Sequence, residues 1–298
     1  MFNKHPKGLI AAALANLGER FGFYTMMAIL VLFLQAKFGM NGKEAGFIYS
    51  TFYFSIYILA LVGGIIADKT RNYKGTIFTG IVLMAVGYLL LAIPSKTPVD
   101  NKMLYLVITC ASLFVIAFGN GLFKGNLQAL VGQMYDNPQY ANMRDSGFSL
   151  FYMFINIGAI FAPFAAVGVR NWWLSTFGYN YDADLPALCH GQLAGTLSPE
   201  ATETYHTLVT KASTAPVQDY TAFASDYLNV FTTGFHYAFG VAIIAMAISL
   251  TIYWLNKKNF PDPSKKTVAS SASSTVVEMS AQEVKQRMYA LFAVFGVV

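Results

Sequence analysis

The sequence predicts an all-α, polytopic membrane protein, and three observations lead to this fold class. Of the 298 residues, 55% are hydrophobic and 12% are charged, whereas a soluble domain carries roughly 25% charged residues. Apolar runs of about 20 residues, long enough to cross a ~30 Å hydrocarbon layer as a helix, recur along the chain. The basic residues gather in the short stretches between these runs. Since backbone polar groups must be satisfied inside a bilayer, runs of this length indicate helices.

Six of the apolar runs can each span the membrane, and we expect each to form one helix. They lie at Leu9–Phe33, Ala45–Ala67, Gly75–Ile93, Met103–Leu130, Phe148–Val169 and Phe231–Leu255. A seventh run begins near Tyr289 and stops at Val298. A helix that ended inside the hydrocarbon would leave polar backbone groups unpaired, so we expect the chain to be a truncated piece of a longer protein.

The runs divide the chain into three predicted parts. Residues 1–257 would form a six-helix N-terminal transmembrane bundle, with a long extracytoplasmic loop at 170–230. Residues 258–284 would form a cytoplasmic linker, because the Ser-rich run at 270–274 and two prolines give them a flexible composition. Residues 285–298 would begin the seventh transmembrane helix.

The basic residues predict the orientation of the bundle. If the N-terminus is cytoplasmic, the inner connections receive Lys4, Lys7, Lys69, Arg71, Lys74, Arg144, Lys257, Lys258, Lys265 and Lys266. The short outer connections hold Lys37, Lys43, Lys96 and Lys102. Cytoplasmic loops are enriched in lysine and arginine, so we expect a multi-pass protein of the cell's inner membrane with its N-terminus inside.

Composition also excludes several classes of function. The net charge of +5 follows from membrane topology, and no nucleic-acid partner is predicted. The two cysteines, Cys110 and Cys189, form neither a disulfide framework nor a metal-binding pattern. We therefore predict no metal, no cofactor and no enzymatic activity.

Three ionised residues lie deep inside the apolar runs: Glu19, Arg20 and Lys124. A charge at the middle of a bilayer costs at least about 2.5 kcal/mol on insertion scales, so it normally faces a partner or a watery cavity. A static ion pair that joins two helices is one interpretation, and a transport pathway is the other. Asn120 shares a helix face with Lys124, which favours the pathway.

Aromatic and amide side chains accompany these charges. Tyr24 lies on the Glu19 face of the first helix, Tyr57 is deep in the second, and Tyr152 and Asn156 share one face of the fifth. Packing is the alternative role for the tyrosines. Hydrogen bonding between helices is the alternative for Asn156, because an amide in hydrocarbon needs a partner.

An acidic residue, Asp68, ends the second predicted helix just before a run of basic residues. Its carboxylate could cap or pair at the helix end and so gate the cytoplasmic side. A solvated loop that only sets topology is the alternative reading of this segment.

Three stretches of the sequence resemble the proton-dependent oligopeptide transporters of the major facilitator superfamily. Asn16–Tyr24 is similar to the first-helix motif E-x-x-E-R-F-x-Y-Y, Gly119–Asn126 to the lysine-bearing fourth helix, and Phe148–Gly158 to the fifth-helix signature. The loop Gly64–Lys74 resembles the superfamily's cytoplasmic loop motif, with Asn72 at a glycine position. Asparagine tolerates left-handed backbone, so we expect Asn72 to replace that glycine without strain.

The resemblance implies two six-helix bundles with the substrate site between them. The described sequence would be the N-terminal bundle, and its partner would be the C-terminal bundle of the same parent chain. Small peptides and protons would be the transported species, and alternating access the mechanism.

The resemblance also implies roles for particular residues. Glu19, Arg20 and Lys124 would couple the proton, and Lys124 would bind the carboxylate of the peptide. The residues expected at the substrate are Arg20, Tyr24, Tyr57, Asn120, Lys124, Tyr152 and Asn156.

This sequence departs from the family's first-helix motif at three positions. Asn16 replaces a glutamate, Phe23 a tyrosine, and Met27 an arginine. Asn16 cannot take up a proton and Met27 cannot bind a carboxylate. The alternative function is therefore a facilitator, or a symporter of another small charged solute, with altered proton coupling. A receptor or assembly subunit that does not transport is a third reading.

Overall fold

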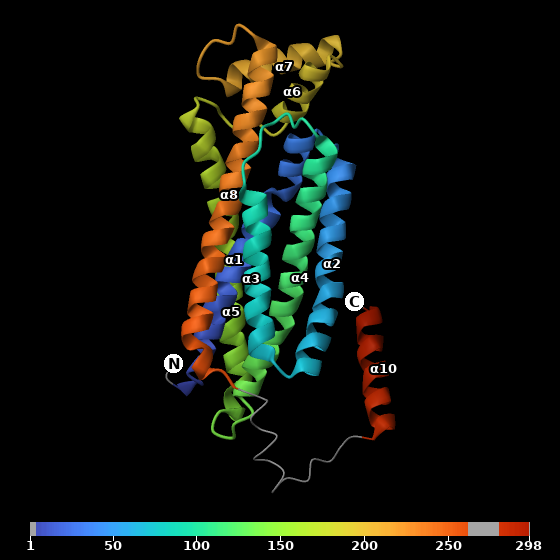
Figure 1. Ribbon diagram of the computed structural model, residues 1–298, viewed down its shortest axis with the longest axis vertical. Helices are drawn as coiled ribbons and strands as arrows, with labels where there is room; N and C mark the ends of the chain where they lie inside the picture. The colour runs from blue at the N-terminus through green and yellow to red at the C-terminus, as the bar shows by residue number, and fades with distance from the viewer. Residues whose placement is uncertain (1–3, 262–279, 298) are drawn as a thin grey trace. The chain divides into compact units, whose positions relative to one another are not determined.

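Six long helices form a bundle in the computed structural model, which describes residues 4–261 and 280–297 (Figure 1). They are α1 (Gly8–Phe38), α2 (Gly42–Thr70), α3 (Tyr73–Ala92), α4 (Lys102–Met134), α5 (Arg144–Thr176) and α8 (Tyr220–Asn256). Each is long and apolar enough to cross a membrane. No strand occurs in the described ranges, and the predicted all-α membrane fold is confirmed.

The ends of the helices follow local sequence signals. Asn41 begins α2 in a reciprocal capping box with Glu44, and the left-handed Gly39 ends α1 at φ 60°. Asn72 does not adopt the left-handed backbone, so its tolerance of that conformation is not needed here. Arg71 is the left-handed residue, at φ 49°, whereas Asn72 has φ −116° and its side chain accepts from the backbone nitrogen of Gly75 to cap α3.

Within the bundle, α1 packs against α8 and α5, and α4 packs against α3 and α2. Figure 1 shows these helices running side by side along the long axis of the molecule. The turn between α2 and α3 and the short connection through η2 (Ala141–Met143) keep successive helices antiparallel. A 3-10 turn, η3 (Lys257–Asn259), follows α8.

The predicted loop at 170–230 is largely helical. The fifth long helix continues to Thr176 and α8 begins at Tyr220, and between them lie α6 (Leu185–Ala194) and α7 (Pro199–Ala212). With 37 residues, α8 is about 55 Å long, so it extends well past a ~30 Å hydrocarbon layer. We call residues 177–219 the cap.

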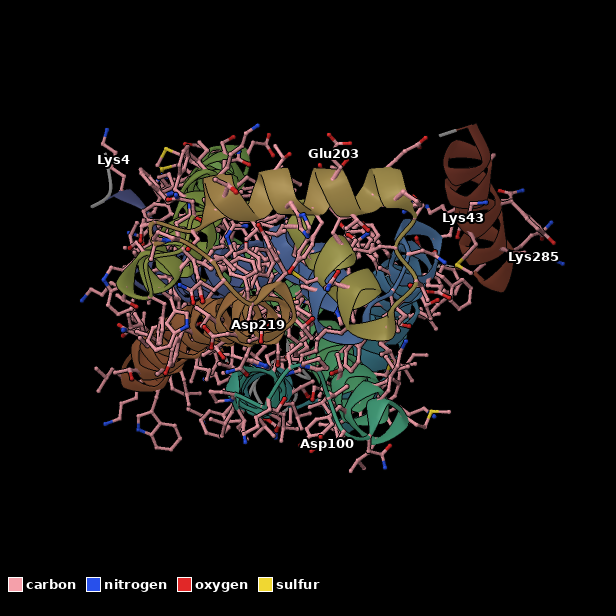
Figure 2. All side chains as sticks on the ribbon, turned by 90° about the horizontal axis from the view of Figure 1, so that it is seen from above. Lys4, Lys43, Asp100, Glu203, Asp219 and Lys285 are labelled. Atoms are coloured by element: carbon pink, nitrogen blue, oxygen red, sulfur yellow. The ribbon has the colours of Figure 1, made fainter. Side chains whose placement is uncertain are left out.

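The cap closes one end of the bundle, opposite the N-terminus (Figure 1). Figure 2 looks down on this end and shows α7 lying across the long helices with Glu203 on its outer side. His190 of α6 bonds through Nε2 to the carbonyl oxygen of Ala36 over 2.8 Å, which ties the cap to α1. Burial raises the pKa of the Cys189 thiol to about 12, so this cysteine is neutral and unreactive at physiological pH.

The C-terminal unit contains one described helix, α10 (Ala281–Val297). It begins eight residues before the predicted start of the seventh apolar run at Tyr289, because the amphipathic segment with Glu283 and Lys285 is already helical. Most of the predicted linker, residues 262–279, lies outside the described residues.

Close packing at a glycine of α4 supplies a test of this fold. A Cβ at Gly121 would overlap the backbone of Leu59 in α2, whereas a Cβ at Gly125 would meet nothing within 4 Å. We expect Gly121→Ala to destabilise the chain by about 1–3 kcal/mol through overpacking. The measurement is unfolding of the purified chain in detergent, with Gly125→Ala as the matched control.

Gly125→Ala should leave stability unchanged or raise it by about 0.5–1 kcal/mol, because alanine favours a helix interior over glycine. Equal destabilisation by both variants would contradict the packing of α4 on α2.

Candidate functional site

A bidentate ion pair lies inside the bundle on α1. Arg20 Nη2 donates to Glu19 Oε1 over 2.5 Å, and Arg20 Nε donates to Glu19 Oε2. Glu19 is fully buried and Arg20 is 5% exposed. Two charges in a low-dielectric interior are tolerable only when they neutralise each other with good geometry, which this pair does.

Aromatic rings cover the guanidinium of this pair. Arg20 Cζ lies 4.7 Å from the centroid of the Phe23 ring and 6.0 Å from that of the Tyr24 ring. Cations are attracted to ring faces at such distances. Phe23 is buried and Tyr24 is half-buried, so the rings separate the charge from the surface of the bundle.

The fourth helix supplies a third polar group to the pair. Asn120 Nδ2 donates to Glu19 Oε1 over 2.7 Å and lies 3.9 Å from Met84 Sδ. Asn120 reaches this depth because α4 and α3 touch at Gly119 and Gly80, where a Cβ on either glycine would overlap the carbonyl of the other. The sequence predicts that Asn120 contacts the substrate. In the structure its side chain is fully buried and bonds to the Glu19 carboxylate.

Tyr88 of α3 also belongs to this centre, although it is not among the residues that the sequence predicts there. It is fully buried, one turn beyond Met84, whose sulfur lies 3.9 Å from the Asn120 amide. Its hydroxyl has no hydrogen-bond partner within the described part of the chain. A single tyrosine in the apolar run of α3 could have drawn attention to it, because a hydroxyl in hydrocarbon needs a partner.

Lys124 lies one turn beyond Asn120 on α4 and is half-buried. Its Nζ is 5.6 Å from the centroid of the Tyr57 ring. The described residues contain no ion pair between Lys124 and Glu19, because Arg20 occupies the carboxylate. Lys124 is therefore the cation of this centre that has no carboxylate partner in the described structure.

The remaining predicted cavity residues lie at the surface of the bundle. Tyr57 is 55% exposed, and its hydroxyl donates to that of Tyr53 over 3.1 Å. Tyr152 and Asn156 are exposed on α5, and no contact joins either to Glu19. The structure thus brings Glu19, Arg20 and Asn120 into direct contact and leaves the α5 residues apart.

The predicted gating residue lies far from this centre, at the opposite end of α2 from the cap. Asp68 is exposed, and its carboxylate accepts a hydrogen bond from the hydroxyl of Tyr73 at the start of α3. This bond spans the turn between the two helices. It fixes the end of α2 and makes no contact with the ion pair.

Two of the three substituted motif positions, Asn16 and Met27, lie before and after the ion pair on α1 and add no charge. Asn16 is 4% exposed, one turn before Arg20, and Met27 is half-buried two turns after it. Since both side chains are uncharged, Glu19 alone provides a carboxylate at the centre. The described residues hold no group of three histidine, cysteine, aspartate or glutamate side chains that could bind a metal ion.

Six helices that can each cross a membrane, with a buried acid–base pair and a half-buried lysine among them, define the class of the chain as a polytopic membrane protein. A family model described as PTR2, the POT family, matches residues 74–294. Because this match covers most of the chain, the chain belongs to the POT family.

Curated relatives agree with this membership. The chain is 34% identical over 185 residues to "Peptide transporter YePEPT" of Yersinia enterocolitica, covering 60% of this chain and 34% of the relative. It is 34% identical over 179 residues to "Dipeptide and tripeptide permease A" of Enterobacter sp. (strain 638), covering 59% and 32%. The matches thus span about a third of the length of these relatives, which are transporters and not enzymes.

Solved structures show the same fold. A mutant of a peptide transporter POT in complex with sulfate is 25% identical, with a TM-score of 0.56, covering 98% of this chain and 44% of that one. The tetrameric transporter PepTSo2 has a TM-score of 0.59 at 22% identity, covering 96% and 47%. The six long helices therefore correspond to the N-terminal half of a POT-type major facilitator fold.

The ion pair predicts an asymmetric response to mutation. Arg20→Met would leave the buried Glu19 carboxylate without its counter-charge, and we expect a loss of about 3–5 kcal/mol of stability. The double variant Glu19→Gln/Arg20→Met removes both charges and should regain most of this loss. Thermal unfolding of the purified chain in detergent measures both effects.

Arg144→Met is the control, because Arg144 is exposed at the start of α5. It should change stability little. A double variant as unstable as Arg20→Met would contradict the role of the pair in holding the bundle together.

Proposed function

We propose that this chain is the N-terminal half of a secondary transporter that imports di- and tripeptides by proton symport with alternating access. The observation that carries the proposal is the buried Glu19–Arg20 pair beside Lys124, a cation without a carboxylate partner in the described residues. Membership of the POT family and the peptide-transporting relatives support the substrate class. The C-terminal six-helix bundle of the parent chain would complete the substrate cavity.

This half offers groups that could bind the carboxylate and the side chains of a peptide substrate. The peptide carboxylate would bind Lys124, and Arg20 when it is released from Glu19. Tyr24, Tyr57, Tyr152 and Asn156 would offer rings, hydroxyls and an amide to varied side chains. Tyr57, Tyr152 and Asn156 are exposed on the isolated bundle, as residues that line a cavity between two halves would be.

Proton coupling would work by making or breaking the ion pair between Arg20 and Glu19. An ionised Glu19 holds the guanidinium with two hydrogen bonds. A proton on Glu19 removes the negative charge, so the guanidinium loses its counter-ion and becomes available to the substrate. The transporter would then favour the state in which both proton and peptide are bound.

The proposed orientation places the N-terminus in the cytoplasm and the cap outside the cell's inner membrane. The distribution of basic residues supports it, and the cap fits it because Lys211 is the one lysine or arginine in residues 177–219. Asp68 would then lie at the cytoplasmic end, where the bond to Tyr73 could hold a gate.

Lys124 provides the test of substrate binding. In the complete transporter, Lys124→Ala should lower uptake of labelled dipeptide at least about tenfold, because one hydrogen bond to a charged group contributes about 1.5–3 kcal/mol. Lys43→Ala, an exposed lysine at the start of α2, should leave uptake unchanged. Uptake at the wild-type level in Lys124→Ala would contradict binding of the peptide carboxylate by Lys124, whereas a wild type without uptake above background would favour a protein that does not transport.

The neutral residues Asn16 and Met27 favour a second candidate function, a facilitator or a symporter of another small charged solute. Proteoliposomes separate the candidates. A proton symporter should accumulate dipeptide only under an inward proton gradient and should acidify the lumen as it does so. Dipeptide counterflow that never moves protons would instead establish the facilitator.

A further inference from the structure

Two buried polar atoms beside Glu19 have no hydrogen-bond partner within the described residues. They are the side-chain oxygen Oδ1 of Asn120 and the hydroxyl of Tyr88, and both residues are fully buried. Leaving such a group unsatisfied costs about 1–3 kcal/mol. The free-energy cost of these two unpaired atoms has a physical explanation if both form hydrogen bonds in a second state of the centre.

Counting donors and acceptors identifies that second state. The ionised Glu19 carboxylate only accepts, and it already receives bonds from Arg20 Nε, Arg20 Nη2 and Asn120 Nδ2. Asn120 Oδ1 also only accepts, so it can form no bond with a carboxylate. A protonated Glu19 gains an O–H donor, and the free oxygen of Asn120 is then an acceptor on the amide that already touches it.

We propose that Asn120 and Tyr88 form the site that receives the protonated Glu19 after Arg20 has left it. The acid O–H at Oε2 donates to Asn120 Oδ1, and Asn120 Nδ2 keeps its bond to the carbonyl oxygen Oε1. The Tyr88 hydroxyl donates to Oε1 in place of Arg20 Nη2. The added proton is the transported one, and Arg20 stays charged. This inference rests on the proposed function, in which Glu19 carries the proton.

The packing of α3 on α4 supports a receiving site that is already in place. Gly80 and Gly119 bring the two backbones into contact, and Met84, one turn from Tyr88, touches the Asn120 amide. Both receiving groups therefore stand on one rigid helix pair. The acid and its arginine stand on a different helix, α1.

The other titratable groups around Glu19 are two cations and two tyrosines, and neither tyrosine forms a hydrogen bond with Glu19 or Asn120 in the described residues. Arg20 and Tyr24 lie on α1, Lys124 on α4, and Tyr53 of α2 interacts with Arg20. At this level α8 faces α1 with Ala242, Ala245, Met246 and Ser249, and α5 faces it with Gly158, none of which titrates. Lysine and arginine only donate when charged, so they cannot accept the acid proton.

Tyr88→Phe tests the proposal, because it removes a hydroxyl that has no bond in the ionised state and gains one in the neutral state. In the complete transporter, the pH midpoint of dipeptide uptake should move about 0.5–1 unit toward acid. The purified chain should unfold at the same temperature as the wild type or higher.

Tyr253→Phe is the matched control. Tyr253 is also fully buried, and its hydroxyl donates to the carbonyl oxygen of Lys74 over 3.0 Å. This variant should lower the unfolding temperature and leave the pH midpoint of uptake where it is.

A second measurement uses the purified chain alone. During acid titration, the infrared carboxyl band that disappears in Glu19→Gln should shift to higher frequency in Tyr88→Phe, because the neutral acid loses a hydrogen bond. An unshifted band together with an unshifted uptake midpoint would overturn the receiving site and leave proton symport intact. Proton-driven uptake that survives in Glu19→Gln would overturn the role of Glu19 as proton carrier, on which the receiving site rests. Dipeptide uptake by the wild-type transporter that moves no protons would instead overturn the proposed symport itself.

Discussion

The structure depends on the neutralisation of one fully buried carboxylate, that of Glu19. An ionised glutamate at this depth is tolerable because Arg20 meets it with two hydrogen bonds and Asn120 with a third. Neighbouring residues on α1 supply both charges, so the counter-charge of Glu19 comes from its own helix. The remaining helices need only exclude water around it, and α4 contributes the amide that fixes its orientation.

Small residues make that contribution possible. A polar side chain on α4 reaches α1 only if α4 can sit close to both of its neighbours, and glycine permits this at Gly119 against α3 and at Gly121 against α2. The same region of α4 therefore carries two kinds of residue with different tasks. Gly119 and Gly121 set the distance between backbones, while Asn120 and Lys124 use the space to approach the carboxylate and Tyr57.

Much of this could be predicted from the sequence, and the misses have physical causes. Apolar run length revealed all six spans, but not that α8 begins at Tyr220, because helical continuation beyond the hydrocarbon leaves no hydropathy signal. The depth of Glu19 marked a functional centre, whereas its choice of Arg20 over Lys124 depends on rotamers that spacing does not determine. Tyr88 escaped notice because a lone tyrosine in an apolar run resembles ordinary core packing.

The substitutions Asn16 and Met27 simplify the electrostatics that transport would have to use. One carboxylate and two cations remain near the centre, so in the described state a single positive charge, on Lys124, is left over for an anion. On the proposed function, a proton on Glu19 raises this excess to two, because Arg20 keeps its charge and loses its counter-ion. The pull on a peptide carboxylate therefore increases when the proton binds, and by reciprocity a bound carboxylate makes the proton bind more tightly. Coupling of this kind needs only one titrating acid on this helix, which is what the substitutions have left.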